Sequence, residues 1–199
     1  MSFDEATLRF YETQSQAYAT ATKGAPAADM RRFLNGLPEG SRVLELGCGG
    51  GHDSLILLAA GMDVVPTDGS PAMAAEAEGR IGRTVEVLRI NDLAFDEEFH
   101  GVFASACLLH LDRGPRNEAL CAIGRALKPG GRLYASFKSA EAPWRDSLGR
   151  FYGPAEAGEL RAALIDAGLG GEVLIDRRQG GGFGGEAIEW LHVHCRKRA

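Results

Sequence analysis

The chain has 199 residues, of which 45% are hydrophobic and 25% are charged, and it carries a formal net charge of −5. These values fit one globular domain, residues 1–199, and the acidic balance argues against nucleic acid as a main partner. No stretch has 18 uncharged apolar residues, and the first residues lack a signal-peptide pattern, so we expect no membrane segment and no leader. Four cysteines without C-x-x-C spacing favour reduced thiols in a cytoplasmic protein and no metal site.

Two helices are expected before the first strand. Ser2 and Glu5 have the spacing of a capping box, which predicts a helix over residues 4–18. A small, polar loop follows, and a second helix is predicted over residues 27–37. The Pro and Gly that come next break the chain before the first strand.

A buried strand, residues 43–46, is followed by three glycines at alternate positions, Gly47, Gly49 and Gly51, and then by a helix over residues 54–60. Glycine allows positive φ and close backbone approach without a Cβ. In open α/β sheets such a turn lies at the carboxyl ends of the strands, where ligands bind. The pattern therefore predicts a small molecule lying on main chain; the alternative is a tight turn without a ligand.

The spacing of the turn indicates which ligand it suits. The dinucleotide fingerprint G-x-G-x-x-G would require glycine at position 52, where His52 stands. Glu45 lies just before the turn, and its carboxylate would oppose a pyrophosphate but attract a ligand that carries an ammonium and a sulfonium.

The second strand is predicted over residues 63–67, and Asp68 ends it, 21 residues after the first glycine of the turn. An acidic residue at this distance meets the ribose hydroxyls in nucleotide-binding βαβ units. Ser70 then caps a helix. Met73, on the first turn of that helix, can lie against an adenine or pack in the core.

The E-x-G-x-G-x-G motif, with acidic residues after successive strands, resembles the S-adenosylmethionine-dependent methyltransferases of the Rossmann-like class. The resemblance covers nearly the whole chain and is nearest to the short tellurite-resistance and biosynthetic members that act on small molecules. It implies S-adenosylmethionine as cofactor, covered by the helical segment of residues 1–37. It implies a cofactor site made by Tyr11, Tyr18, Glu45, Gly47, Gly49, Gly51, Asp68, Gly69, Met73, Asn91, Asp92, Leu93 and Ala106.

Three of those residues follow the third predicted strand, residues 84–89. Asn91, Asp92 and Leu93 resemble the family's adenine-edge motif, in which Asp92 would accept the adenine amino group. An Asn-Asp pair after a strand is also common in plain turns.

The remaining elements predict a doubly wound α/β fold with right-handed crossovers and helices on both faces. They are strands over residues 101–106, 132–137, 172–178 and 188–196, and helices over residues 115–127 and 154–167. The resemblance adds a seven-stranded, mostly parallel sheet whose last strand is antiparallel. The Gly-rich segment 180–185 is expected to be a flexible hairpin loop, because no helix follows it.

Acceptor residues are expected in the loop after the fifth strand. Lys138 and Arg145 would favour an anionic acceptor, and Trp144 and Tyr152 would exclude water. The run up to Tyr152 adds Arg150. The alternative is that both cations lie on a solvated loop and pair with neighbouring carboxylates or water.

The resemblance places His110 at the reaction centre as a catalytic base, although a lone histidine after an apolar strand is also commonly structural. The sequence thus predicts methyl transfer to a small-molecule acceptor, anionic or a soft nucleophile, by a monomer or homodimer without nucleic-acid or membrane partners. Two rival classes are a non-catalytic S-adenosylmethionine-binding protein and a nicotinamide-dependent oxidoreductase. His52 and the lack of a Tyr-x-x-x-Lys pair disfavour the second.

Overall fold

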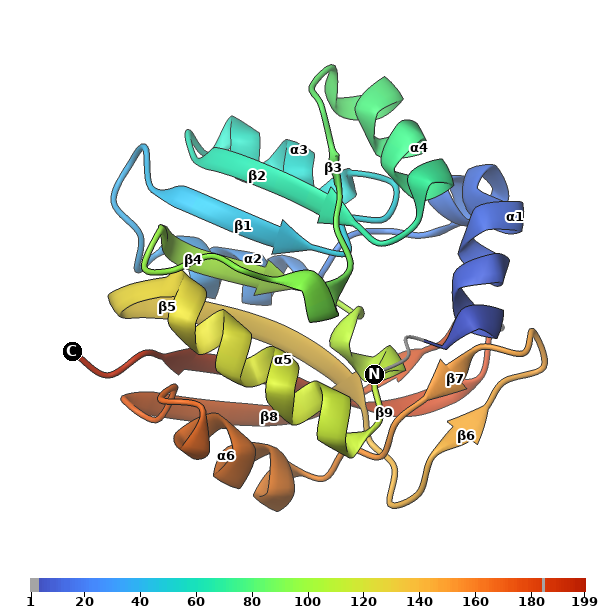
Figure 1. Ribbon diagram of the computed structural model, residues 1–199. Helices are drawn as coiled ribbons and strands as arrows, with labels where there is room; N and C mark the ends of the chain where they lie inside the picture. Colours follow the sequence, from blue (N-terminus) through green and yellow to red (C-terminus); the bar gives the residue numbers. More distant parts are fainter. Residues whose placement is uncertain (1–3, 184) are drawn as a thin grey trace.

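The computed structural model describes residues 4–183 and 185–199, which build a seven-stranded sheet flanked by helices (Figure 1). The sheet has the order β3-β2-β1-β4-β5-β9-β8. Its strands are β1 (Arg42–Leu46), β2 (Asp63–Asp68), β3 (Glu86–Val87), β4 (Phe99–Ala104), β5 (Leu127–Lys138), β8 (Glu172–Gly181) and β9 (Ala187–Arg196). The helices are α1 (Glu5–Ala21), α2 (Ala27–Leu34), α3 (His52–Ala59), α4 (Pro71–Ile81), α5 (Arg113–Ala126) and α6 (Ala157–Asp166), with short 3₁₀ turns η1 (Ile90–Asp92) and η2 (Leu108–His110).

The strand directions confirm the predicted doubly wound sheet. Strand β1 pairs in parallel with β2 on one side and β4 on the other, and β9 runs antiparallel to both β5 and β8. Successive side chains of β1 point to opposite faces of the sheet, so this strand contributes to the hydrophobic core on each face. Val43 packs with Leu57 of α3 and with residues of α2, whereas Leu44 packs with Leu120 of α5. In Figure 1, α5 and α6 lie on the near face of the sheet and α2 and α3 on the far face.

A buried polar cluster fixes α2 to the β8–β9 hairpin. Asp29 of α2 is 2% exposed and accepts hydrogen bonds from Arg178 Nη2 at 2.5 Å and from His194 Nε2 at 3.0 Å. The two donors hold the pKa of Asp29 near 2 against the opposing effect of burial.

Several boundaries differ from the predictions. Helix α1 is capped by Asp4, which accepts from the Thr7 backbone N–H at 2.8 Å, while the predicted cap Ser2 lies outside the described residues. Strand β3 has two residues instead of the six predicted, and β4 ends two residues early because Ala106 adopts a φ of 52°. The predicted acceptor loop contains an antiparallel ribbon, β6 (Trp144–Arg145) with β7 (Phe151–Tyr152). None of the helices in residues 4–183 and 185–199 has the length and hydrophobicity of a transmembrane span.

Candidate active site

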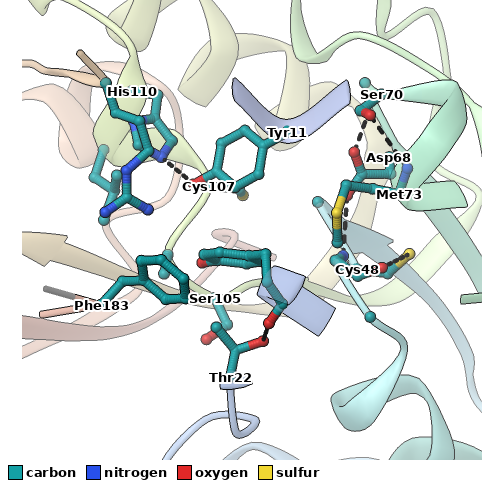
Figure 2. A pocket seen from close by; sticks show the side chains of 18 of the residues that line it. Tyr11, Thr22, Cys48, Asp68, Ser70, Met73, Ser105, Cys107, His110 and Phe183 are labelled. Atoms are coloured by element: carbon teal, nitrogen blue, oxygen red, sulfur yellow. Dashed lines mark hydrogen bonds between the residues drawn. The ribbon is translucent and has the colours of Figure 1, made fainter. Parts of the chain in front are cut away.

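A cavity of about 480 Å³ lies at the carboxyl ends of β1, β2 and β4, and α1 covers it. Figure 2 shows its two sides, with Asp68, Met73 and Cys48 on one and His110, Tyr11 and Phe183 on the other. Eight of the predicted cofactor residues line it: Tyr11, Tyr18, Gly47, Gly49, Asp68, Gly69, Met73 and Ala106. Tyr152, from the predicted acceptor set, lines it too. His110 and Lys138 line it as well.

The glycine turn has left-handed backbone at each of its three predicted positions, with φ of 63° at Gly47, 56° at Gly49 and 75° at Gly51. A Cβ at Gly49 would meet only the Met73 methyl at 3.9 Å, so this position faces the cavity. A Cβ at Gly51 would contact Ile81 at 3.0 Å instead. Gly51 therefore serves the packing of the turn on α4 and does not line the cavity, which corrects its predicted role.

Asp68 lies at the end of β2 with its carboxylate facing the cavity. Its two oxygens accept the backbone N–H groups of Gly49 and Ser70, each at 2.9 Å. Burial raises the pKa of Asp68 to about 6, against the opposing effect of these hydrogen bonds. Each oxygen keeps a lone pair, so the carboxylate can accept two further hydrogen bonds from a ligand.

Glu45 lies beneath the turn, not in the cavity lining. It is 2% exposed and accepts a hydrogen bond from Ser54 Oγ at 2.5 Å. Burial raises its pKa to about 8. The expected contact of Glu45 with a positively charged ligand is therefore wrong, because β1 directs this side chain into α3. A different carboxylate, Asp53 at the start of α3, lines the cavity and accepts from the Ala25 backbone N–H at 2.8 Å.

The predicted adenine-edge residues lie outside the cavity. Asn91 and Asp92 are exposed in η1, and Leu93 packs in the core. The cavity is lined instead by the three residues before them, Leu88, Arg89 and Ile90. The prediction fails because β3 ends at Val87, two residues earlier than the sequence pattern indicated, so the chain leaves the sheet before reaching Asn91.

His110 is buried between two polar partners. Its Nδ1 lies 2.6 Å from the Phe151 carbonyl oxygen, which only accepts, so Nδ1 carries the proton. Its Nε2 therefore accepts from the Tyr11 hydroxyl at 2.8 Å, the contact drawn in Figure 2. Burial lowers the pKa of His110 to about 4, so the ring is neutral at physiological pH and is a weak base.

Two buried cations line the same side of the cavity, Lys138 at the end of β5 and Arg150 before β7. Lys138 is 4% exposed; its Nζ lies 4.0 Å from the centre of the Tyr152 ring and 3.5 Å from Glu186 Oε1. The guanidinium of Arg150 lies 4.8 Å from the centre of the Phe10 ring, and its Nε donates to Asp146 at 2.8 Å.

The other two predicted acceptor residues do not line the cavity. Arg145 is exposed and binds Asp4 with both of its terminal nitrogens, at 3.0 and 2.6 Å, so its predicted place at the acceptor site is wrong. Trp144 supports the site from behind, because its ring stacks on Tyr152 with centroids 4.4 Å apart. Arg150, which directly precedes β7, takes the place predicted for Arg145: it is buried and lines the cavity.

The hairpin between β8 and β9 also contributes, in a way the sequence pattern did not reveal. Phe183 lines the cavity, and its ring lies 5.0 Å from Tyr18 and 6.1 Å from Phe10. Gly181 and Trp190 line it too. The Gly-rich run thus closes the site against α1. An exposed aromatic residue inside that run was the one available signal.

The fold and this cavity define a Rossmann-like α/β protein with a site for an adenosine-containing small molecule. A family model described as a methyltransferase domain matches residues 43–131. A methyltransferase-family protein of Encephalitozoon cuniculi is 31% identical over 150 residues, which are 74% of this chain and 69% of the relative. The chain therefore belongs to the S-adenosylmethionine-dependent methyltransferases of the Rossmann-like class.

Two further proteins are similar. The cypemycin N-terminal methyltransferase of a Streptomyces species is 31% identical over 137 residues, 66% of this chain and 54% of that protein. The 1,6-didemethyltoxoflavin-N1-methyltransferase of Burkholderia thailandensis, solved with S-adenosylhomocysteine, superposes with a TM-score of 0.77 at 19% identity over 100% of this chain and 92% of its own. The chain spans 32% of the first curated relative that it matches and 54% of the second. The substrates of these relatives are therefore not assigned to this chain.

Proposed function

We propose that this protein transfers a methyl group from S-adenosylmethionine to a small-molecule acceptor. The observation that carries the proposal is one continuous cavity. It joins the glycine turn and Asp68 to a chamber lined by Tyr11, His110, Lys138 and Arg150, all beneath α1. Cofactor and acceptor would thus share one space beneath α1.

The residues present fit this cofactor. Asp68 has lone pairs for both ribose hydroxyls, and Met73 with Ile90 supplies apolar surface for the adenine. Gly49 leaves room for the ligand to lie on main chain. Asp53, rather than Glu45, is the carboxylate available to an ammonium group. The cofactor supplies a methyl group that its sulfonium has already activated.

The protein's own contribution is then alignment and exclusion of water. Holding two reactants in line can lower a barrier by ~7–11 kcal/mol. The Tyr11 hydroxyl donates to His110 Nε2, which leaves the lone pairs of Tyr11 Oη free to accept from an N–H or O–H of the acceptor. Because His110 is neutral and weakly basic, we assign it to positioning Tyr11 rather than to removing a proton.

The character of the chamber favours an anionic acceptor over a neutral soft nucleophile. Lys138 and Arg150 line this chamber and both are cations, whereas the carboxylates of the cavity lining, Asp53 and Asp68, are assigned to the cofactor. The similar structure that holds 1,6-didemethyltoxoflavin beside S-adenosylhomocysteine supports a small acceptor. The cytoplasmic location, the oligomeric state and the nearer likeness to tellurite-resistance methyltransferases stay predictions.

Isothermal titration with S-adenosylmethionine, S-adenosylhomocysteine and NAD tests the cofactor. Micromolar binding of the first two without binding of NAD is expected. Binding of NAD alone would favour the oxidoreductase alternative. A screen of small acceptors with radiolabelled methyl groups then tests turnover, and tight cofactor binding with no acceptor methylated would point to a non-catalytic binding protein.

A further inference from the structure

The environment of Lys138 is unusual for a lysine. Its ammonium group lies between three aromatic rings, 4.0 Å from the centre of Tyr152, 5.1 Å from Trp144 and 5.9 Å from Trp190. Its one carboxylate partner among the described residues is Glu186, at 3.5 Å, near the limit of an ion pair. A buried ammonium with three donors is poorly satisfied by this single distant acceptor.

Glu186 differs from Lys138 in exposure. Its side chain is 38% exposed, whereas that of Lys138 is 4% exposed. Glu186 precedes β9, outside the cavity lining, and can turn to water at little cost. Lys138 cannot, because its ammonium is enclosed. An incoming anion would therefore exchange places with Glu186 and keep one negative charge beside the buried lysine.

Arg150, unlike Lys138, has a carboxylate partner that an incoming anion cannot replace. Asp146 binds its Nε at 2.8 Å and has a side chain only 8% exposed, so this carboxylate cannot leave for water. One exchangeable negative charge in the chamber matches a monoanion better than a dianion. Arg150 instead presents its guanidinium to the ring faces of Phe10 and Phe183, at 4.8 and 5.3 Å.

The walls of the chamber are predominantly aromatic. The rings come from separate elements: Tyr11 and Tyr18 from α1, Tyr152 from β7, Phe183 from the hairpin and Trp190 from β9. Aromatic walls favour flat aromatic ligands through stacked and edge-to-face contacts. Figure 2 shows Phe183 and Tyr11 directed toward the same space as His110.

We infer that the methyl acceptor is an aromatic carboxylic acid, and that its carboxylate displaces Glu186 from Lys138 while its ring lies against the aromatic walls. This inference rests on the proposed function, since it concerns the acceptor half of the same cavity. Glu186 is in this sense a built-in competitor of the acceptor. Its removal should therefore strengthen acceptor binding, a result that a merely structural ion pair would not give.

Isothermal titration of the protein saturated with S-adenosylhomocysteine tests the inference with three probes. These are 4-hydroxybenzoate, its neutral amide 4-hydroxybenzamide, and the non-aromatic cyclohexanecarboxylate. The aromatic acid should bind about tenfold more tightly than either of the other two, because only it has both the charge and the flat ring. Equal binding of acid and amide, or binding of none of the three, would overturn the inference.

Two variants with matched controls sharpen the test. Lys138→Met should weaken 4-hydroxybenzoate about tenfold and leave S-adenosylhomocysteine unchanged, while Lys128→Met at the far end of the same strand should change neither. Glu186→Gln should tighten binding of the acid about threefold or more, while Glu189→Gln, a nearby carboxylate in β9 that pairs with Arg177, should not.

The acceptor class and the methyltransferase function are refuted by different measurements. If the protein binds S-adenosylhomocysteine but not 4-hydroxybenzoate, the acceptor class is refuted and the methyltransferase function still stands. Absence of S-adenosylhomocysteine binding refutes the proposed function instead. A Glu186→Gln variant that binds the acid no better than the parent refutes the exchange with Lys138, whatever the Lys138→Met variant does to the fold.

Discussion

Removing the carboxylate of Asp68 should separate cofactor binding from stability. In Asp68→Ala, a bound cofactor loses the acceptor of its ribose hydroxyls, which costs ~1–3 kcal/mol of binding, or ~5- to 150-fold in Kd. Asp68→Asn keeps one acceptor oxygen, so its Kd for the cofactor should lie between those of the parent protein and Asp68→Ala. Isothermal titration with S-adenosylhomocysteine measures both losses.

The same substitution should change the free energy of unfolding little. Burial raises the pKa of Asp68 from 3.8 to about 6, so the ionised carboxylate costs the folded state ~3 kcal/mol above pH 6. Alanine relieves that cost but leaves the N–H groups of Gly49 and Ser70 without their acceptor, at a comparable cost. The control is Asp63→Ala, at the exposed opposite end of the same strand. Unchanged affinity in a folded Asp68→Ala protein would refute the ribose assignment.

Three further predictions concern pH, the glycine turn and the buried cluster of α2. Cofactor affinity should fall as the pH is lowered from about 7.5 to about 5, because hydrogen bonds from the ribose favour the ionised form of Asp68, whose pKa is about 6; a pH-independent Kd would contradict this. Gly49→Val should abolish binding with a native circular dichroism spectrum, since the added side chain enters the cavity at a φ of 56°; a variant that still binds tightly would contradict it. Asp29→Asn should remove ~2 kcal/mol of stability at neutral pH, because the native pKa of Asp29 is about 2 against 3.8 unfolded. That contribution is present above pH 4 and is lost in the parent as the pH falls toward 2, so a denaturant series at both pH values checks it.

The sequence predicted the parts of the site that depend on local pattern. The glycine spacing and Asp68 follow a strand-turn-helix unit whose geometry is set within about 25 residues, and Gly47, Gly49 and Asp68 line the cavity. Asn91 and Asp92 were misplaced because an edge strand such as β3 has weak periodicity, and it ends two residues before the predicted end. Local pattern also cannot reveal whether a loop residue points inward.

Arg145 and Arg150 illustrate the second limit. Both lie in one polar loop and look equivalent in the sequence, but the pairing of Trp144 with Tyr152 directs one outward to Asp4 and the other inward. The contribution of Phe183 depends on contacts across more than 150 residues, with α1 at the opposite end of the chain. Such contacts are fixed by the completed fold, so no spacing rule could have found them.

The attachment of α1 has a consequence for how the protein folds. Three of its anchors are distant in sequence: Asp4 binds Arg145, 141 residues away, Thr7 accepts from Phe151, 144 residues away, and Tyr11 binds His110, 99 residues away. Contacts of such separation form late, because closing long loops costs entropy that only an assembled sheet can offset. We expect α1, although it precedes the whole sheet in the sequence, to be among the last elements to dock. The cavity is completed in that final step, and a ligand that binds only the completed cavity would hold the helix in place by mass action.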